Sequence, residues 1–217
     1  MVWRILPHAT ACVCASRIYL LDIRQDRYFQ VPPALAPETT AWLERKHACA
    51  PPPPVLALLR RSGIHRGTDD VPTNALKDRI TIPDSLAPAG AASMQRNSHR
   101  AARRVLLSAM RLKLSSLHSI LARRRPRPPL PITRDSGAAL EIASRFDRSR
   151  VLVPIARDCL LDSLALDSLL ERQGIGTQFV FGIAPRPFEA HCWLQTRDTI
   201  LNDSYDHVSR FTPILAL

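Results

Sequence analysis

Proline is the residue that most limits how this chain can fold, because it ends helices and cannot donate a hydrogen bond inside a sheet. The 217-residue sequence contains 19 prolines, and the densest groups lie at positions 32–33, 51–54 and 126–131. Three more fall among the mixed polar residues of 69–90, where we expect a linker. The elements between these breaks must be short, in a chain long enough for two small domains or one large one.

The first 31 residues have the pattern of a β-rich unit. One apolar strand is predicted for residues 2–6. A hairpin follows, in which the strands 18–23 and 27–31 flank the polar turn 24–26. The prolines at 32–33 end this hairpin.

Two helices are predicted to follow the hairpin. The first begins at Pro37 and has Glu38 in its first turn. The second spans residues 55–62 and stops at Gly63. A small sheet and these helices would together make a first domain, residues 1–85.

One segment holds most of the positive charge. The formal net charge is +11, and residues 96–127 contain ten basic and no acidic residues, so the rest of the chain is close to neutral. High positive charge favours nucleic-acid binding. This segment, however, has no aromatic side chain to stack on bases, and only three of the 30 basic residues are lysines, a skew that GC-rich coding produces by itself.

The same segment has apolar residues at helical spacing, which predicts one helix over residues 98–125. This helix would open a second domain, residues 95–217. Its apolar side could be an ordinary core face, or it could lie on a membrane or on the acidic surface of a partner.

The C-terminal part alternates between helices and strands. Helices are predicted for residues 136–146 and 155–173, and strands for 178–183, 190–196 and 199–203. Helices followed by an antiparallel strand series indicate the α+β class.

Three residues of this part have the chemistry of a catalytic site. Cys159 stands in the first turn of the helix 155–173, where unpaired backbone N–H groups and the helix dipole favour a thiolate. His191 begins one predicted strand and Asp203 ends the next. Because residue 197, midway between them, falls in the connecting turn, antiparallel pairing would bring their side chains together. A nucleophile, a base and an orienting carboxylate are what cysteine nucleophilic catalysis needs.

The other candidate residues have structural interpretations. Trp193 shares a strand face with His191 and is predicted to wall the site from water, whereas Cys192 points to the opposite face and into a core. Cys12 and Cys14 are predicted to be small buried residues of a strand, because no further Cys or His pair completes a zinc site. Five cysteines are an odd number and do not indicate a disulfide framework. No metal and no cofactor are predicted.

The residues around the cysteine and the histidine resemble the leader peptidase of lasso peptide biosynthesis. The resemblance covers roughly residues 135–213. It is carried by Cys159-Leu160, Ser163-Leu164-Ala165-Leu166, Leu169-Leu170-Glu171-Arg172-Gln173-Gly174-Ile175, Phe179-Val180-Phe181-Gly182, Ala190-His191-Cys192-Trp193-Leu194 and Phe211-Thr212-Pro213-Ile214. It implies a transglutaminase-like (papain-like) cysteine protease fold in which Cys159 is the nucleophile, His191 the base and Asp203 the orienting residue. Cys192 departs from the pattern, which usually has a small residue such as alanine there.

A second resemblance concerns the N-terminal domain. The run Leu20-Leu21-Asp22-Ile23-Arg24-Gln25-Asp26-Arg27-Tyr28-Phe29 is similar to fused family members that carry a leader-recognition domain. This domain is winged-helix-like and resembles the small peptide chaperone of pyrroloquinoline quinone synthesis. The resemblance implies that the leader adds a strand to an exposed sheet edge. The edge strand would consist of Arg27, Tyr28, Phe29, Gln30 and Val31, with the helix 55–62 as a groove wall.

Together these features predict an ATP-independent cysteine peptidase that binds the leader of a lasso peptide precursor and cleaves at the leader–core junction. The resemblance implies two partners, the precursor peptide and an asparagine-synthetase-like cyclase. ATP use would belong to the cyclase, since the chain has no GxxxxGK[ST] loop. Nucleic acid is not among the predicted partners.

The expected location is the cytoplasm, because neither a transmembrane segment nor a secretory signal pattern is predicted. Two alternative functions stay open. The same triad could transfer an acyl group to an amine, as in transglutaminases, or the chain could be a basic nucleic-acid-binding protein.

Overall fold

The chain folds into both helices and strands, which confirms the predicted α+β class. The computed structural model describes residues 1–45, 49–65, 76–84, 98–124, 132 and 136–217. One compact unit comprises Met1–Ile80, Ile183–Glu189 and Thr212–Leu215, and the other comprises Thr81–Gly182, Ala190–Phe211 and Ala216–Leu217. The predicted domain ends at residues 85 and 95 lie outside the described residues.

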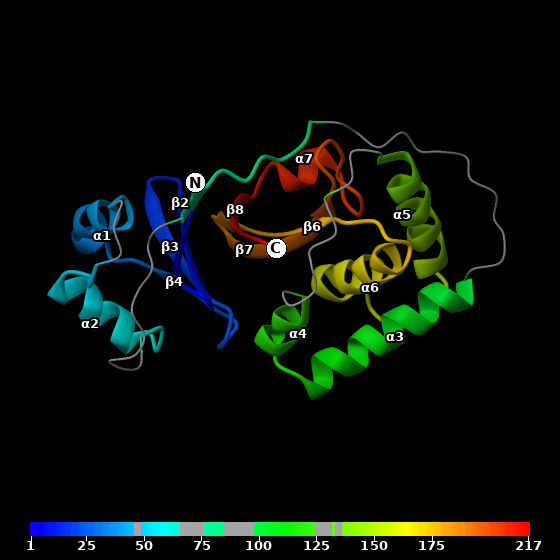
Figure 1. Cartoon of the computed structure of the whole chain (residues 1–217), viewed down its shortest axis with the longest axis horizontal. Helices are drawn as coiled ribbons and strands as arrows, with labels where there is room; N and C mark the ends of the chain where they lie inside the picture. The colour runs from blue at the N-terminus through cyan, green and yellow to red at the C-terminus, as the bar shows by residue number, and fades with distance from the viewer. Residues whose placement is uncertain (46–48, 66–75, 85–97, 125–131, 133–135) are drawn as a thin grey trace. The chain divides into compact units, whose positions relative to one another are not determined.

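The N-terminal unit is built on an antiparallel sheet with the strand order β4-β3-β2-β1-β5. Figure 1 labels β2, β3 and β4 of this sheet. Its strands are β1 (Val2–Leu6), β2 (Ala9–Cys14), β3 (Arg17–Asp22), β4 (Arg27–Gln30) and β5 (Leu76–Asp78). Ala15 and Ser16 join β2 to β3 with positive φ angles of 47° and 60°, as the tight hairpin turn with the favoured twist requires. The hairpin predicted for residues 18–23 and 27–31 is present as β3 and β4, which pair in antiparallel fashion, and β4 lies at one edge of the sheet.

The strand β5 corrects one prediction. Residues 69–90 were expected to be a linker, but Leu76–Asp78 pairs with β1, opposite Val2, Trp3 and Arg4. Three residues are too short for hydrophobic alternation to mark a strand in the sequence. Residues 66–75 and 85–97 lie outside the described part of the chain.

Two helices, α1 (Ala36–Leu43) and α2 (Pro53–Arg61), complete this unit after the short 3-10 helix η1 (Pro33–Leu35). Both α-helices have proline in their first turn, where the missing N–H costs nothing. Their buried residues join the inward side of the sheet in one hydrophobic core. That core includes Trp3, Ile5, Leu20, Trp42, Leu43, Val55 and Leu59.

The second unit begins with helices that pack on one another. They are α3 (Ser98–Leu114), α4 (Leu117–Arg124), α5 (Ser136–Arg150) and α6 (Cys159–Arg172). The helices α3, α5 and α6 lie side by side (Figure 1). Ala101 and Val105 of α3 are buried, whereas Leu106, Met110 and Leu114 are exposed. The basic helix therefore has a core face and, separately, an exposed apolar stripe.

The prediction of one unbroken helix over 98–125 is wrong. The helix stops at Leu114, and α4 starts after Ser115 and Ser116. The Ser116 hydroxyl accepts a hydrogen bond from the Ser119 backbone N–H at 3.3 Å, as a helix cap does. Serine competes with the helix for backbone groups, which explains the break within an apolar pattern that continues on both sides.

A second sheet follows α6 and has the strand order β7-β6-β8. Its strands are β6 (Gln178–Pro185), β7 (Phe188–Gln195) and β8 (Thr212–Ala216), and the short helix α7 (Tyr205–Val208) precedes β8. The strand predicted for 199–203 is wrong. This segment makes only an isolated bridge between Gln195 and Ile200, and the third strand is β8 instead.

Among the residues that the structure describes, no helix has both the length and the apolarity needed to cross a bilayer.

Candidate active site

Cys159 is the first residue of α6, four positions after the predicted helix start at residue 155. Asp158 sets this start. Its backbone is extended, and its carboxylate Oδ1 accepts a hydrogen bond from the Leu161 backbone N–H at 2.9 Å. The half-buried thiol therefore lies at the end of the helix where backbone N–H groups and the helix dipole are positive.

The segment that leads into α6 is held by Arg150, whose side chain is almost fully buried. Its Nε donates to Asp162 Oδ1 at 2.6 Å. Its other nitrogens donate to three backbone carbonyls, those of Val153 at 3.3 Å, Ile155 at 2.9 Å and Ala156 at 2.8 Å. One guanidinium thus fixes both the loop before the nucleophile and the first turn of its helix.

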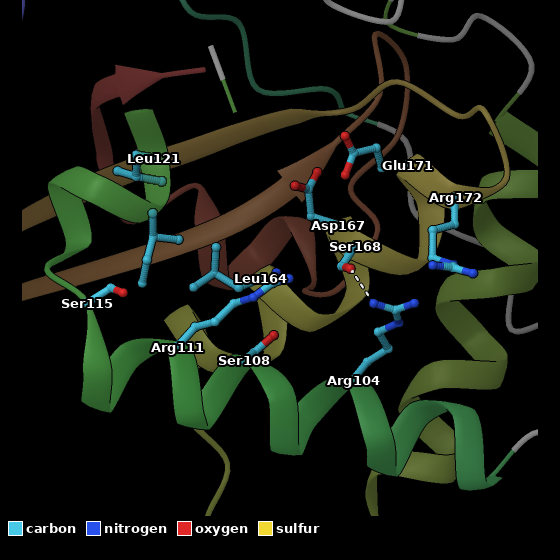
Figure 2. A pocket seen from close by; sticks show the side chains of 11 residues that line it. Arg104, Ser108, Arg111, Ser115, Leu121, Leu164, Asp167, Ser168, Glu171 and Arg172 are labelled. Carbon is cyan, nitrogen blue, oxygen red and sulfur yellow. Dashed lines mark hydrogen bonds between the residues drawn. The ribbon is translucent and has the colours of Figure 1, made fainter. Parts of the chain in front are cut away.

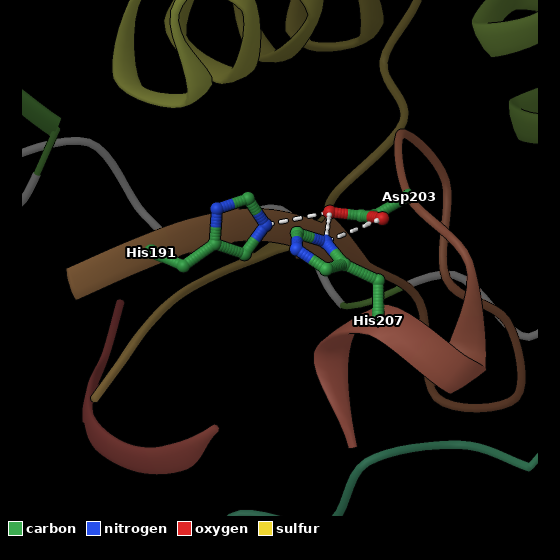
Figure 3. A group of neighbouring side chains, drawn as sticks. All are labelled: His191, Asp203 and His207. Atoms are coloured by element: carbon green, nitrogen blue, oxygen red, sulfur yellow. Dashed lines mark hydrogen bonds and ion pairs between the residues drawn. The ribbon is translucent and has the colours of Figure 1, made fainter. Parts of the chain in front are cut away.

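His191 lies on β7, and its Nε2 is 2.6 Å from Asp203 Oδ2 (Figure 3). The ring also shares a hydrogen bond with the Cys159 thiol. Because Nε2 is engaged by the carboxylate, Nδ1 is the ring nitrogen available to the sulfur. The structure therefore brings together the three residues that the sequence selected as a nucleophile, a base and an orienting carboxylate.

The ionisation of the cysteine and the histidine is shifted in opposite directions. A hydrogen bond from the Cys192 thiol is the largest cause that lowers the pKa of Cys159, and the hydrogen bond and charge of His191 lower it further, to about 5 despite burial. Burial acts to lower the pKa of His191, but hydrogen bonds to Asp203 and Cys159 outweigh it and raise this pKa to about 9. At neutral pH the pair is therefore a thiolate and an imidazolium.

Cys192 has a larger role than the sequence indicated. It is buried, as predicted for a core residue, but its thiol also contacts Cys159. The hydrogen bond with Cys159, together with burial, raises the pKa of Cys192 well above its usual value. Cys192 thus stays protonated next to the nucleophilic sulfur, and its Sγ also lies 4.0 Å from the Ser163 hydroxyl, to which it can donate.

Asp203 reaches His191 without belonging to a strand. Its neighbour Asn202 accepts a hydrogen bond from the Leu194 N–H through Oδ1 at 2.8 Å and donates from Nδ2 to the Ser163 hydroxyl at 2.8 Å. The hydrogen bonds of the Asn202 side chain thus replace the backbone hydrogen bonds that a longer strand pair would have made. It ties the segment before Asp203 to both β7 and α6.

His207, which the sequence analysis did not select, is a second partner of Asp203. Its Nδ1 lies 3.1 Å from Oδ1 and 2.9 Å from Oδ2 of this carboxylate. Burial acts to raise the pKa of Asp203, but the hydrogen bonds from His191 and His207 lower it below the usual value. The signal was present in the sequence, because residues 203 and 207 are one helical turn apart and Ser204 caps α7.

Aromatic rings enclose the imidazole. The Trp193 ring, which is fully buried, stacks on His191 with 6.1 Å between centroids and 20° between planes. The Phe211 ring lies 5.0 Å from the same imidazole. A Cβ added at Gly182 would come within 2.9 Å of both the Phe211 Cβ and the Trp193 ring, so this packing requires glycine.

The predicted leader-binding residues belong to the N-terminal unit. Arg27, Tyr28, Phe29 and Gln30 form the edge strand β4, and Val31 follows it as a buried residue. On its inner side β4 pairs with β3, from Asp22 opposite Arg27 to Tyr19 opposite Gln30. In the described part of the chain, the sheet ends at β4.

A separate cavity of about 330 Å³ lies between α3, α4 and the later part of α6 (Figure 2). Arg104, Arg111 and Arg172 gather around it, together with the carboxylates of Asp167 and Glu171. Burial, and then the charge of neighbouring arginines, lowers the pKa of Arg104, which donates to the Ser168 hydroxyl at 3.2 Å. Cys159, His191 and Asp203 do not line this cavity.

Comparison with known proteins identifies one relationship. The family model described as the transglutaminase-like superfamily matches residues 102–216. The matched range includes Cys159, His191 and Asp203. No curated protein and no solved structure shows a significant match.

Proposed function

The chain belongs to the transglutaminase-like superfamily, and we propose that it is a cysteine peptidase that uses Cys159, His191 and Asp203 as its catalytic triad. The family match supports an enzyme of the cysteine-protease or acyl-transferase kind. The observation that carries the choice of residues is the arrangement at the start of α6. There, the Cys159 thiol interacts through a hydrogen bond with an imidazole whose Nε2 is held by Asp203 at 2.6 Å.

The proposed reaction begins with attack of the Cys159 thiolate on the scissile carbonyl carbon. Backbone N–H groups in the first turn of α6, those of Cys159 and Leu160, are suited to bind the oxyanion. The His191 imidazolium gives its Nδ1 proton to the leaving amine, and the C–N bond breaks. An acyl-enzyme remains on the sulfur. Neutral His191 then takes a proton from water, whose oxygen attacks the thioester and releases the acid.

Asp203 supports both steps without itself changing protonation. It holds the Nε2 side of the ring, so that Nδ1 faces the sulfur, and its negative charge stabilises the imidazolium. The proposed reaction steps use no bound metal and no cofactor, and they do not consume ATP.

The proposed substrate is a lasso peptide precursor, cut at the junction of leader and core. The resemblance of the segments around Cys159 and His191 to lasso leader peptidases supports this substrate. The position of β4 at a sheet edge supports leader binding by strand addition, since an edge presents unpaired backbone groups to an extended peptide. The freed amine of the core would pass to an asparagine-synthetase-like cyclase.

The test is incubation of a synthetic precursor with the full chain, followed by mass spectrometry. We expect two products whose masses sum to that of the precursor plus one water. The variant Cys159→Ala should give no cleavage, whereas Cys49→Ala, at a cysteine outside the site, should cleave at the wild-type rate. Cleavage by Cys159→Ala at the wild-type rate would overturn the proposal.

Acyl transfer is the second candidate, because the enclosed site suits it. The Trp193 and Phe211 rings flank the imidazole and limit the access of water, and transfer differs from hydrolysis in whether water or an amine attacks the acyl-enzyme. Adding a primary amine to the same assay separates the two. Transfer gives an amide whose mass equals that of the acid product plus the mass of the amine minus the mass of one water. Peptidase activity gives the acid alone.

A further inference from the structure

We propose that His191, Asp203 and His207 form a zinc-binding site, and that zinc bound there inhibits the enzyme reversibly by occupying its general base. Inhibition rests on the proposed function, whereas zinc binding does not. The triad needs only one histidine on Asp203, and the second one, His207, makes a third metal ligand available (Figure 3).

The donor atoms are already close together. One ligand atom from each of His191, Asp203 and His207 lies within 4.8 Å of the other two. Asp203 Oδ2 is 2.6 Å from His191 Nε2 and 2.9 Å from His207 Nδ1. Two imidazole nitrogens and one carboxylate are a ligand set that suits zinc. Magnesium and calcium are less suited to it, because they bind oxygen donors.

Zinc needs slightly more room than these hydrogen bonds provide. Ligands about 2.0–2.1 Å from a tetrahedral zinc ion lie roughly 3.3 Å apart, so Asp203 Oδ2 must move away from His191 Nε2, and His207 Nδ1 away from Asp203 Oδ2, by less than about 1 Å each. His207 is 41% exposed and can make this movement, whereas His191, at 14%, is held between aromatic rings. Three protein ligands leave the fourth position to water.

Zinc on His191 would stop the proposed reaction through the ring's other nitrogen. The metal takes Nε2, which ends the bond to Asp203 and leaves the single ring proton on Nδ1, facing the Cys159 sulfur. A ring in this state cannot accept a proton from water. Zinc displaces the Nε2 proton of His191 to solvent, and this exchange is reversible, so a chelator that removes zinc should restore the activity.

The binding test uses zinc chloride and the untagged full chain, with affinity measured by competition against a chromophoric chelator. We expect His207→Ala to weaken zinc binding at least about tenfold, since even the loss of a group that supports a metal ligand costs about 10–100-fold. The matched control is His99→Ala, which removes an exposed histidine at the start of α3. Cys159→Ala should keep the tight site, which separates it from binding by the thiol.

A second variant guards against loss of structure. His207→Asn can still donate a hydrogen bond to Asp203 but has no imidazole, so it too should bind zinc at least about tenfold more weakly. Equal zinc affinity in wild type, His207→Ala and His207→Asn would overturn the inference.

The effect on activity is measured as the zinc concentration that halves each variant's own rate. This concentration should rise at least about tenfold in both His207 variants and stay unchanged in His99→Ala, and a chelator should restore the wild-type rate. Peptidase activity that persists with zinc saturating the site would overturn the inhibition. If the chain cleaves no precursor but zinc binding still depends on His207, the proposed function fails and the metal site stands.

Discussion

Replacing Arg150 by methionine should destabilise the protein more than any change of a surface charge. The methionine keeps most of the buried volume and removes the guanidinium. It leaves the Asp162 carboxylate without its 2.6 Å partner and the carbonyls of Ile155 and Ala156 without the guanidinium donors, whereas the Val153 carbonyl keeps the Ile155 N–H at 2.8 Å. Breaking a buried ion pair by removing one partner typically costs about 3–5 kcal/mol.

This loss is a large share of the total stability. Domains have a free energy of unfolding of about 5–15 kcal/mol, so Arg150→Met should leave a protein that folds but has a clearly lower urea midpoint. Asp162 keeps its longer contact with Arg157, at 3.4 Å, which places the expected loss nearer about 3 kcal/mol than 5. The activity should fall as well, because the loop before Cys159 loses its brace.

The assay is urea unfolding followed by circular dichroism. Arg150→Lys keeps the charge but cannot reproduce the fork of donors, so it should be intermediate. The matched control is Arg145→Met on the same helix. Arg145 pairs with Glu141, but both side chains are about half exposed, and exposed pairs contribute about 0–1 kcal/mol. If Arg150→Met and Arg145→Met differ by less than about 1 kcal/mol, the assigned role of the guanidinium is wrong.

Four further predictions follow from the site and the edge strand. The pKa of Cys159 is about 5 and that of His191 about 9, so the plot of kcat/KM against pH should be bell-shaped. The value should fall below about pH 5 as the thiolate is protonated, and above about pH 9 as the imidazolium is deprotonated. A profile without either limb would contradict the ion pair. The pH dependence of Cys159 alkylation should move to higher pH in Cys192→Ala, which removes the largest cause of the lowered pKa, but not in Cys49→Ala. Gly182→Ala should lower the free energy of unfolding by about 1–3 kcal/mol, measured by thermal denaturation, because the new Cβ meets Phe211 and Trp193 at 2.9 Å. Hydrogen–deuterium exchange of the full chain with excess precursor should show protected amides in Arg27–Gln30, and unchanged exchange there would count against strand addition at β4.

Local signals in the sequence predicted the parts of the fold that depend on neighbouring residues. The hairpin of β3 and β4 was predicted because polar turn residues lie between two β-rich runs, and the end of α2 because a glycine follows it. Gly63 has the positive φ of 74° that this residue type allows. The break between α3 and α4 was missed, although Ser115 and Ser116 mark it, because the apolar spacing continues across it.

Long-range contacts explain what the sequence could not predict about the site. Nothing local marks Arg150 among the 27 arginines of the chain, because its role comes from being buried beside Asp162 and the loop at 153–156. Cys192 was assigned to the opposite face of its strand by alternation alone, but its thiol interacts with that of Cys159. Such contacts depend on how the elements pack and not on the spacing of residues.

The contact between Asp203 and His191 was predicted correctly, but the reason given for it was incomplete. Antiparallel pairing about residue 197 was expected to place it beside His191, but the ladder ends after Gln195 and Ile200. A carboxylate beyond the last ladder bond needs other restraints. Asp203 has them from the Asn202 amide, from the Ser204 backbone N–H at 2.7 Å and from His207. Because this carboxylate is held by side chains rather than by a strand, one substitution at His207 is expected to alter both its ionisation and its metal affinity, without unfolding the sheet that carries His191.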